Sequence, residues 1–166
     1  MTHNDLRVRI LVVDDDVEIL QVLKRFLELD PRIEAVATAE TGAEALRVLG
    51  KDDRFDVILS DERLPDIRGV QVLAHARHAH PGMVRILFSG YRDQEAAIKG
   101  INEARIHQYV EKPVELAELT NRIFDLVERR ELDATVNGEI YLNARSMAKS
   151  IHRRRQGADP AGKVDT

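Results

Sequence analysis

The sequence predicts an α/β fold in which helices cover both faces of a doubly wound, five-stranded parallel sheet. Two features support this prediction. Short apolar runs alternate with amphipathic stretches five times along the 166-residue chain, and a series of such units folds into a parallel sheet with helices on both faces. Hydrophobic residues make up 43% of the chain, which is enough to build a core between these layers. A helical tail is expected after the fifth unit.

The first two strand–helix units follow from the spacing of apolar residues. The apolar residues of Arg7–Val13 are consecutive, which is typical of a strand that is buried on both faces. Val17–Leu29 follows with leucines on one helical face, and Asp16 is its expected N-cap. In the second unit, Gly50 is expected to end the helix. The second strand and helix are Ile33–Thr38 and Thr41–Leu49.

The other three units are separated by turn residues and repeat the same pattern. Pro65 and Gly69 mark a loop after the third strand, and Pro81-Gly82 follows the third helix, because these residue types favour turns. The expected strand and helix of each unit are Phe55–Ser60 with Val70–Ala79, Val84–Phe88 with Asp93–Ala104, and Gln108–Glu111 with Val114–Glu131.

The composition changes after the fifth unit. We therefore divide the chain into a domain over residues 7–131 and an extension over residues 132–166. Within the extension, Ile140–Gln156 carries apolar residues loosely on one side, which indicates a helix. The small and polar residues of Gly157–Thr166 are expected to be disordered.

Composition and charge also narrow the classes of function. The net charge is −4 and aromatic residues make up 4% of the chain, so we expect no nucleic-acid partner. The chain has no cysteine, which excludes disulfides and thiolate metal sites. It shows no signal peptide and no apolar run of membrane-spanning length. We expect a cytoplasmic protein with no membrane contact.

Four of the apolar runs end in groups that suit phosphoryl chemistry. Ligands of open parallel sheets bind outside the carboxyl ends of the strands, so these groups should meet at one edge. Carboxylate oxygens suit Mg²⁺, and a bound dication would relieve the repulsion between crowded carboxylates. A carboxylate can also attack phosphorus, while an ammonium and a hydroxyl bind phosphoryl oxygens. The residues are Asp14 and Asp15, Asp61, Ser89, and Lys112.

These motifs together resemble the receiver domain of bacterial two-component response regulators. The matching stretches are ILVVDDD at Ile10–Asp16, VILSDERLP at Val57–Pro65, ILFSG at Ile86–Gly90 and YVEKP at Tyr109–Pro113. They occur in the order and at the spacing of that family, and joint agreement is far more specific than any one motif. The resemblance implies a flavodoxin-like sheet with strand order 2-1-3-4-5 and five helices.

The resemblance also implies roles for the residues that bind metal and phosphoryl group. Asp61 corresponds to the phosphoacceptor. Asp14 and Asp15 correspond to the acidic pair that binds Mg²⁺ together with Asp61, and the backbone carbonyl of Arg63 corresponds to a further metal ligand. Lys112 corresponds to the lysine that binds the phosphoryl group.

Two further residues correspond to the family's switch pair, and the resemblance implies partners. Ser89 matches the switch hydroxyl, and Tyr109 matches the aromatic residue that turns inward with it. The phosphodonor would be a sensor histidine kinase or a phosphotransfer protein. A downstream protein would bind the surface formed by the fourth helix, the fifth strand and the fifth helix, and a homodimer is also compatible with this family. No enzymatic activity is expected beyond self-phosphorylation and self-dephosphorylation.

Two alternatives to a stand-alone receiver stay open. The chain could be the receiver portion of a longer regulator, whose output would be a cyclic-di-GMP phosphodiesterase or a DNA-binding domain. Ala97–Tyr109 resembles receivers attached to such phosphodiesterases. Alternatively, Asp14 and Asp16 imitate the opening motif of haloacid-dehalogenase-like phosphohydrolases. Against this, Glu18 stands where that family has Thr or Val nearby, and no later acidic pair follows a strand.

Overall fold

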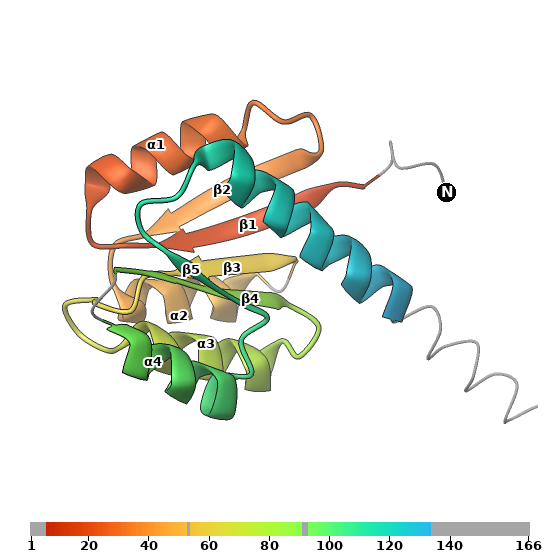
Figure 1. The fold of residues 1–166 in the computed structure, drawn as a ribbon. Helices are drawn as coiled ribbons and strands as arrows, with labels where there is room; N and C mark the ends of the chain where they lie inside the picture. The colour runs from red at the N-terminus through yellow and green to blue at the C-terminus, as the bar shows by residue number, and fades with distance from the viewer. Residues whose placement is uncertain (1–5, 53, 91–92, 134–166) are drawn as a thin grey trace, which may run out of the picture. The chain divides into compact units, whose positions relative to one another are not determined.

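The computed structural model describes residues 6–52, 54–90 and 93–133. Its centre is a sheet of parallel strands in the order β2-β1-β3-β4-β5, visible edge to edge in Figure 1. This confirms both the predicted fold class and the predicted strand order. The strands are β1 (Val8–Val13), β2 (Ile33–Ala39), β3 (Val57–Ser60), β4 (Val84–Ser89) and β5 (Gln108–Glu111).

Helices lie on both faces of this sheet, as the doubly wound prediction requires. Figure 1 shows α1 and residues 116–128 of the last helix on one side, and α2, α3 and α4 on the other. The labelled helices are α1 (Val17–Leu27), α2 (Gly42–Lys51), α3 (Gly69–Ala79) and α4 (Gln94–Lys99).

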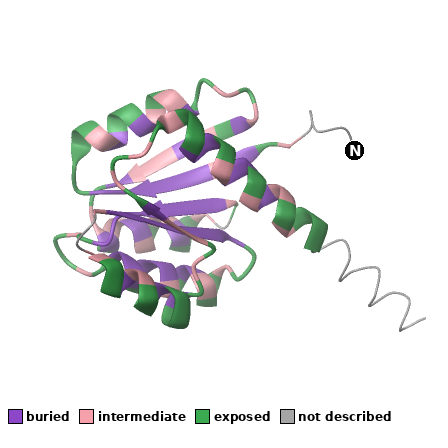
Figure 2. Cartoon of the chain, in the orientation of Figure 1, coloured by how far each residue is buried: buried purple, intermediate pink, exposed green. Residues whose placement is uncertain are grey.

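The core consists of two apolar layers, one on each face of the sheet. Successive side chains of a strand point to opposite faces, so Ile10 and Val12 of β1 pack with the layer beneath α1 and the last helix. Leu11 and Val13 pack with the layer beneath α2 and α3. Because both faces are covered, the three inner strands β1, β3 and β4 are buried along almost their whole length, whereas the edge strands β2 and β5 are only partly buried (Figure 2). This explains the consecutive apolar residues of the sequence.

The second helix does not end where the sequence predicts. It begins after Thr41, whose hydroxyl accepts a hydrogen bond from the Glu44 backbone N–H at 3.0 Å. It then continues through Gly50 to Lys51. Gly50 does not adopt the left-handed conformation that ends a helix, so the prediction that it terminates this helix is wrong.

The fourth helix is also less regular than predicted. An α-helix over Gln94–Lys99 changes into a π-helix, η2 (Gly100–Ala104), which ends at Arg105 in the left-handed conformation with φ of 45°. The guanidinium of the buried Arg85 on β4 donates hydrogen bonds to the carbonyls of Ala104 at 3.0 Å and Arg105 at 3.2 Å. A side chain from a distant strand therefore satisfies the last carbonyls of this helix.

The chain divides into two units, Met1–Glu128 and Arg129–Thr166. Within the second unit the described residues are 129–133, which are helical. The predicted helix at Ile140–Gln156 and the predicted disordered tail at Gly157–Thr166 lie outside the described residues. The proposed boundary at residues 131 and 132 therefore stays a prediction. No helix in the described part of the chain has the length and apolar character needed to cross a membrane.

Candidate functional site

The groups singled out in the sequence lie together at the carboxyl edge of the sheet. Main-chain hydrogen bonds extend the strand ladders by one residue and fix this arrangement. The Asp61 N–H donates to the carbonyl of Val13 at 2.8 Å, and the Lys112 N–H donates to the carbonyl of Ser89 at 2.8 Å. Asp14 follows Val13 directly. The fold thus brings residues that are far apart in the sequence to one edge.

Three carboxylates form a cluster there. One oxygen from each of Asp14, Asp15 and Asp61 lies within 4.8 Å of the others. Asp14 and Asp61 are 2% and 8% exposed, whereas Asp15 is exposed. A set of hard oxygen donors, partly buried and partly open to solvent, fits a divalent cation such as Mg²⁺ that retains several waters. In this protein, these three side chains would hold it.

Lys112 is the cation next to this cluster. Its Nζ donates a hydrogen bond to Asp14 Oδ2 at 2.7 Å and lies 3.5 Å from Asp61 Oδ2. Its ammonium also lies 4.9 Å from the centre of the Phe88 ring, a cation–π arrangement. The peptide bond between Lys112 and Pro113 is cis. Lys112 therefore compensates part of the negative charge of two carboxylates at once.

Burial raises the pKa of Asp61 above the usual value of an aspartate. The nearby charge of Lys112 acts in the opposite direction, and the carboxylate of Asp14 raises this pKa further. The net result is a raised pKa, so ionisation of Asp61 is less favourable than that of an ordinary aspartate. Such destabilisation is common where a site is built for function rather than for stability.

Replacing Asp61 with asparagine is expected to stabilise the metal-free protein. The pKa of Asp61 is higher in the folded than in the unfolded state, so stability is lost as the pH rises through the folded pKa. Asparagine does not ionise, so the variant keeps this stability at neutral pH. At neutral pH with EDTA we expect a gain of about 1 kcal/mol, or about 3 °C in Tm, and no gain below the usual pKa of an aspartate. Differential scanning calorimetry measures this.

The variant Asp125→Asn and the addition of Mg²⁺ are the controls for the Asp61→Asn prediction. Asp125 is exposed on the last helix, so Asp125→Asn should leave Tm nearly unchanged. Added Mg²⁺ should raise the Tm of the wild type more than that of Asp61→Asn, since a ligand stabilises the state that binds it. A lower Tm of Asp61→Asn at neutral pH without metal would contradict the expectation.

Ser89 forms a contact that the sequence did not predict. Its hydroxyl donates a hydrogen bond of 2.6 Å to Asp93 Oδ2. The other carboxylate oxygen of Asp93 accepts a hydrogen bond of 3.0 Å from Nε of Arg63. The metal-binding role that the resemblance implies for the Arg63 carbonyl stays a prediction. From the sequence, Asp93 is expected only as the start of a helix. The one available signal was its position, four residues after Ser89.

Tyr109 is connected to the same turn. Its side chain is half-buried on β5, and its hydroxyl donates a hydrogen bond of 3.3 Å to the carbonyl of Gly90, next to Ser89. Burial raises the pKa of this tyrosine, with smaller contributions from Glu111 and Asp93. Ser89 and Tyr109, the two predicted switch residues, are thus joined through one residue of backbone. Their switching role stays a prediction.

The side chain of Asp16 stabilises the start of helix α1. Its carboxylate accepts hydrogen bonds from the backbone N–H groups of Glu18 and Ile19 at 3.0 and 3.3 Å, and so caps α1. A phosphohydrolase built on Asp14 and Asp16 would need both carboxylates at the reacting centre. The geometry therefore does not favour that alternative.

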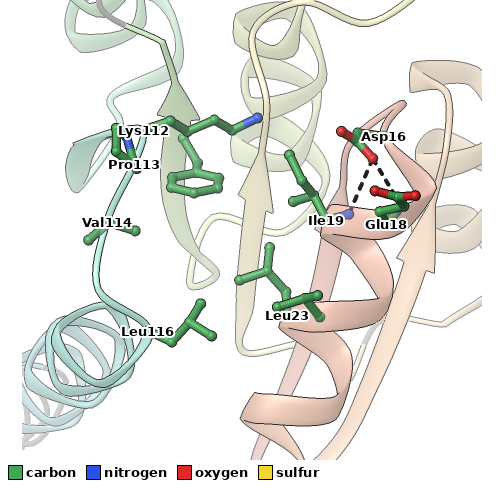
Figure 3. A pocket seen from close by; sticks show the side chains of 10 residues that line it. Asp16, Glu18, Ile19, Leu23, Lys112, Pro113, Val114 and Leu116 are labelled. Carbon is green, nitrogen blue, oxygen red and sulfur yellow. Dashed lines mark hydrogen bonds between the residues drawn. The ribbon is translucent and has the colours of Figure 1, made fainter.

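An apolar groove of about 380 Å³ opens beside the acidic cluster. Figure 3 shows Ile19 and Leu23 of α1 on one side and Lys112, Val114 and Leu116 on the other. Val22 of α1, which also lines the groove, is 54% exposed. The groove therefore provides an exposed apolar surface next to the ammonium of Lys112.

Comparison with known proteins assigns these features to one family. The family model of the response regulator receiver domain matches residues 10–124. The CheY-like response regulator receiver domain protein from Methanospirillum hungatei superimposes with a TM-score of 0.71 at 33% identity, over 76% of this chain and 98% of that chain.

Two transcriptional regulators are related in sequence. The hydrogenase transcriptional regulatory protein HoxA of Cupriavidus necator is 35% identical over 134 residues, which are 81% of this chain and 27% of that protein. The transcriptional regulatory protein PrrA of Mycobacterium tuberculosis is 37% identical over 131 residues, 79% of this chain and 54% of that protein. The chain thus spans between about a quarter and about half of the length of these relatives.

Proposed function

The chain belongs to the family of response regulator receiver domains, and we propose that it accepts a phosphoryl group on Asp61. The observation that carries this proposal is the cluster in which Lys112 Nζ lies 2.7 Å from Asp14 and 3.5 Å from Asp61, whose carboxylates gather with that of Asp15. Receiver domains bind Mg²⁺ at an acidic pocket and are signalling domains, so a low-turnover switch is the function that this geometry supports best.

In the proposed step, an oxygen of the Asp61 carboxylate attacks the phosphorus of a phosphohistidine on a kinase or phosphotransfer protein. The new O–P bond forms as the N–P bond breaks, and the imidazole nitrogen leaves with that electron pair and takes up a proton. The product is an acyl phosphate on Asp61. Lys112 is released from part of its contact with the carboxylates and binds an oxygen of the new phosphoryl group.

We propose that Asp14, Asp15, Asp61 and the backbone carbonyl of Arg63 hold Mg²⁺ during this step. The ion supplies positive charge that offsets the repulsion between the carboxylates and the incoming phosphoryl oxygens. The residues of the chain position the acceptor: the sheet holds the Asp61 backbone, and Asp14 is fixed by accepting a hydrogen bond of 2.9 Å from the Asp16 N–H. Self-phosphorylation and self-dephosphorylation are the reactions that we propose for the chain itself.

The proposed output is a change in binding at the surface formed by α4, β5 and the last helix. Ile98 and Ile101 on α4 and η2 are 62% and 59% exposed, an apolar surface suited to a protein partner or to a second copy of the chain. The hydrogen bond between Tyr109 and the Gly90 carbonyl connects this surface to the Ser89 turn. Because the regulators HoxA and PrrA are longer than this chain, we keep the receiver portion of a longer regulator as an alternative. We place this function in the cytoplasm.

The proposal is tested by incubating the protein with Mg²⁺ and acetyl phosphate and measuring its intact mass. We expect the wild type and the exposed control Asp125→Asn to gain the mass of a single phosphoryl group. Asp61→Asn should gain none, and EDTA should prevent the gain in every variant. Phosphorylation of Asp61→Asn at the wild-type level would overturn the assignment of the acceptor.

A further inference from the structure

We propose that Asp93 is an internal competitor of the phosphoryl group, which holds the Ser89 hydroxyl and the Arg63 guanidinium in the unphosphorylated protein. Asp93 lies outside the acidic cluster and ends no strand. Its carboxylate nevertheless contacts two residues of the acceptor region, one on each oxygen. Because the inference rests on the proposed role of Asp61, its test must also show whether Asp61 binds a phosphoryl-like group at all.

The contact with Ser89 is exclusive. A serine hydroxyl has one hydrogen and can donate it to one acceptor at a time. In this structure the acceptor is Asp93 Oδ2 at 2.6 Å, within the short range typical of a hydrogen bond from a hydroxyl to a carboxylate. Ser89 is fully buried, so solvent does not compete for it. If Ser89 is to donate to a phosphoryl oxygen, it must first leave Asp93.

The contact with Arg63 makes Asp93 a better competitor. The Asp93 side chain is 12% exposed, and Nε of Arg63 lies 3.0 Å from its second oxygen. Burial alone would raise the pKa of Asp93, but the hydrogen bonds from Ser89 and Arg63 outweigh burial and hold that pKa below its usual value. The ion pair with Arg63 therefore holds the Asp93 carboxylate in place as the acceptor for Ser89.

The position of Asp93 shows that this arrangement is not a by-product of helix capping. Asp93 precedes the first residue of α4, where an aspartate usually accepts a hydrogen bond from the helix backbone. Its side chain makes no such bond here. The carboxylate is instead turned toward Ser89 and Arg63, so the start of α4 is connected to the acceptor region through the side chain of Asp93.

Phosphorylation would then exchange one anion for another. Ser89 would donate to the phosphoryl group, and Asp93, left with Arg63, would no longer tie the start of α4 to β4. The cost of separating Asp93 from Ser89 lowers the population of the active conformation before phosphorylation. This makes Asp93 a positioning residue that sets how readily the domain responds.

The test uses beryllofluoride with Mg²⁺ as a phosphoryl mimic, and amide NMR spectra of the full chain. We expect Asp93→Ala to bind beryllofluoride more tightly than the wild type by about tenfold, the effect of losing one hydrogen bond to a charged group. Without the ligand, the Asp93→Ala resonances of β4 and α4 should shift toward those of the saturated wild type. Asp93→Asn, which keeps the size of the side chain, should show a smaller shift in the same direction.

Glu95 provides the matched control, because it is an exposed acid in the first turn of α4. Glu95→Ala should change neither the affinity nor the spectra beyond its neighbours. In a Ser89→Ala background, Asp93→Ala should lose most of its effect, since the competition needs the hydroxyl. Equal effects in both backgrounds, or unchanged or weaker binding by Asp93→Ala and Asp93→Asn, would overturn the competitor role while leaving Asp61 as the acceptor. A wild type that does not bind beryllofluoride, or an Asp61→Asn variant that binds it as tightly, would overturn both proposals.

Discussion

Replacing Lys112 with alanine is expected to slow phosphorylation by acetyl phosphate by about a hundredfold or more, the usual cost of removing a preorganised charge from a developing anion. Lys112 Nζ lies 3.5 Å from the proposed acceptor oxygen and would bind an incoming phosphoryl oxygen. The same variant should bind Mg²⁺ more tightly, because it loses the ammonium that lies 2.7 Å from Asp14. Rates from intact mass and affinities from calorimetry measure the two effects.

The opposite signs of these effects distinguish a local role from a loss of folding. A misfolded variant would lose both phosphorylation and Mg²⁺ binding. Lys99 is exposed at the end of α4, and Lys99→Ala should leave both quantities near their wild-type values. Phosphorylation of Lys112→Ala at the wild-type rate, or a weaker affinity for Mg²⁺ in a folded Lys112→Ala protein, would contradict the proposed role of Lys112.

Replacing Gly69 with alanine is expected to have the largest effect on stability. Its added Cβ would lie 2.0 Å from the carbonyl oxygen of Asp61 and 2.9 Å from Cα of Glu62. Both neighbours are backbone atoms, which cannot move aside without shifting the end of β3. We expect the free energy of unfolding to fall by about 3 kcal/mol, at the upper end for overpacking, and phosphorylation to fall with it because Asp61 is displaced. Urea denaturation measures the first effect.

The substitution Gly50→Ala is the matched control for Gly69→Ala. A Cβ at Gly50 would meet nothing within 4 Å, and the residue lies in α2 at an exposed position. Gly50→Ala should therefore stabilise the protein by about 0.5–1 kcal/mol, since alanine favours a helix over glycine. A Gly69→Ala variant as stable as the wild type would contradict the close packing of α3 against the backbone that follows β3.

The sequence predicted the sheet and its carboxyl edge because their determinants are local. Consecutive apolar residues such as Ile10–Val13 indicate strands buried on both faces, and the group after each strand is read directly from the chain. Parallel strands bring such ends together whatever lies between them. The positions of Asp14, Asp61 and Lys112 at one edge therefore followed from topology and the order of residues.

The features that the sequence missed depend on contacts between distant segments. Arg63 and Ser89 meet at Asp93, and no periodicity predicts that a residue at a capping position will turn away from its helix. The change from α-helix to π-helix is supported by Arg85 from a neighbouring strand. The prediction that Gly50 ends α2 is wrong because a glycine that ends a helix usually adopts the left-handed conformation, which its sequence context does not specify.

The most direct test of the central claim is to locate the phosphoryl group. After phosphorylation by acetyl phosphate with Mg²⁺, reduction with borohydride converts an aspartyl phosphate to homoserine, which peptide mass spectrometry can place in the sequence. We predict homoserine at position 61, in the peptide that follows β3, and none at Asp14 or Asp15. Modification at Asp14 or Asp15 with Asp61 intact would contradict the proposed division between acceptor and metal ligands.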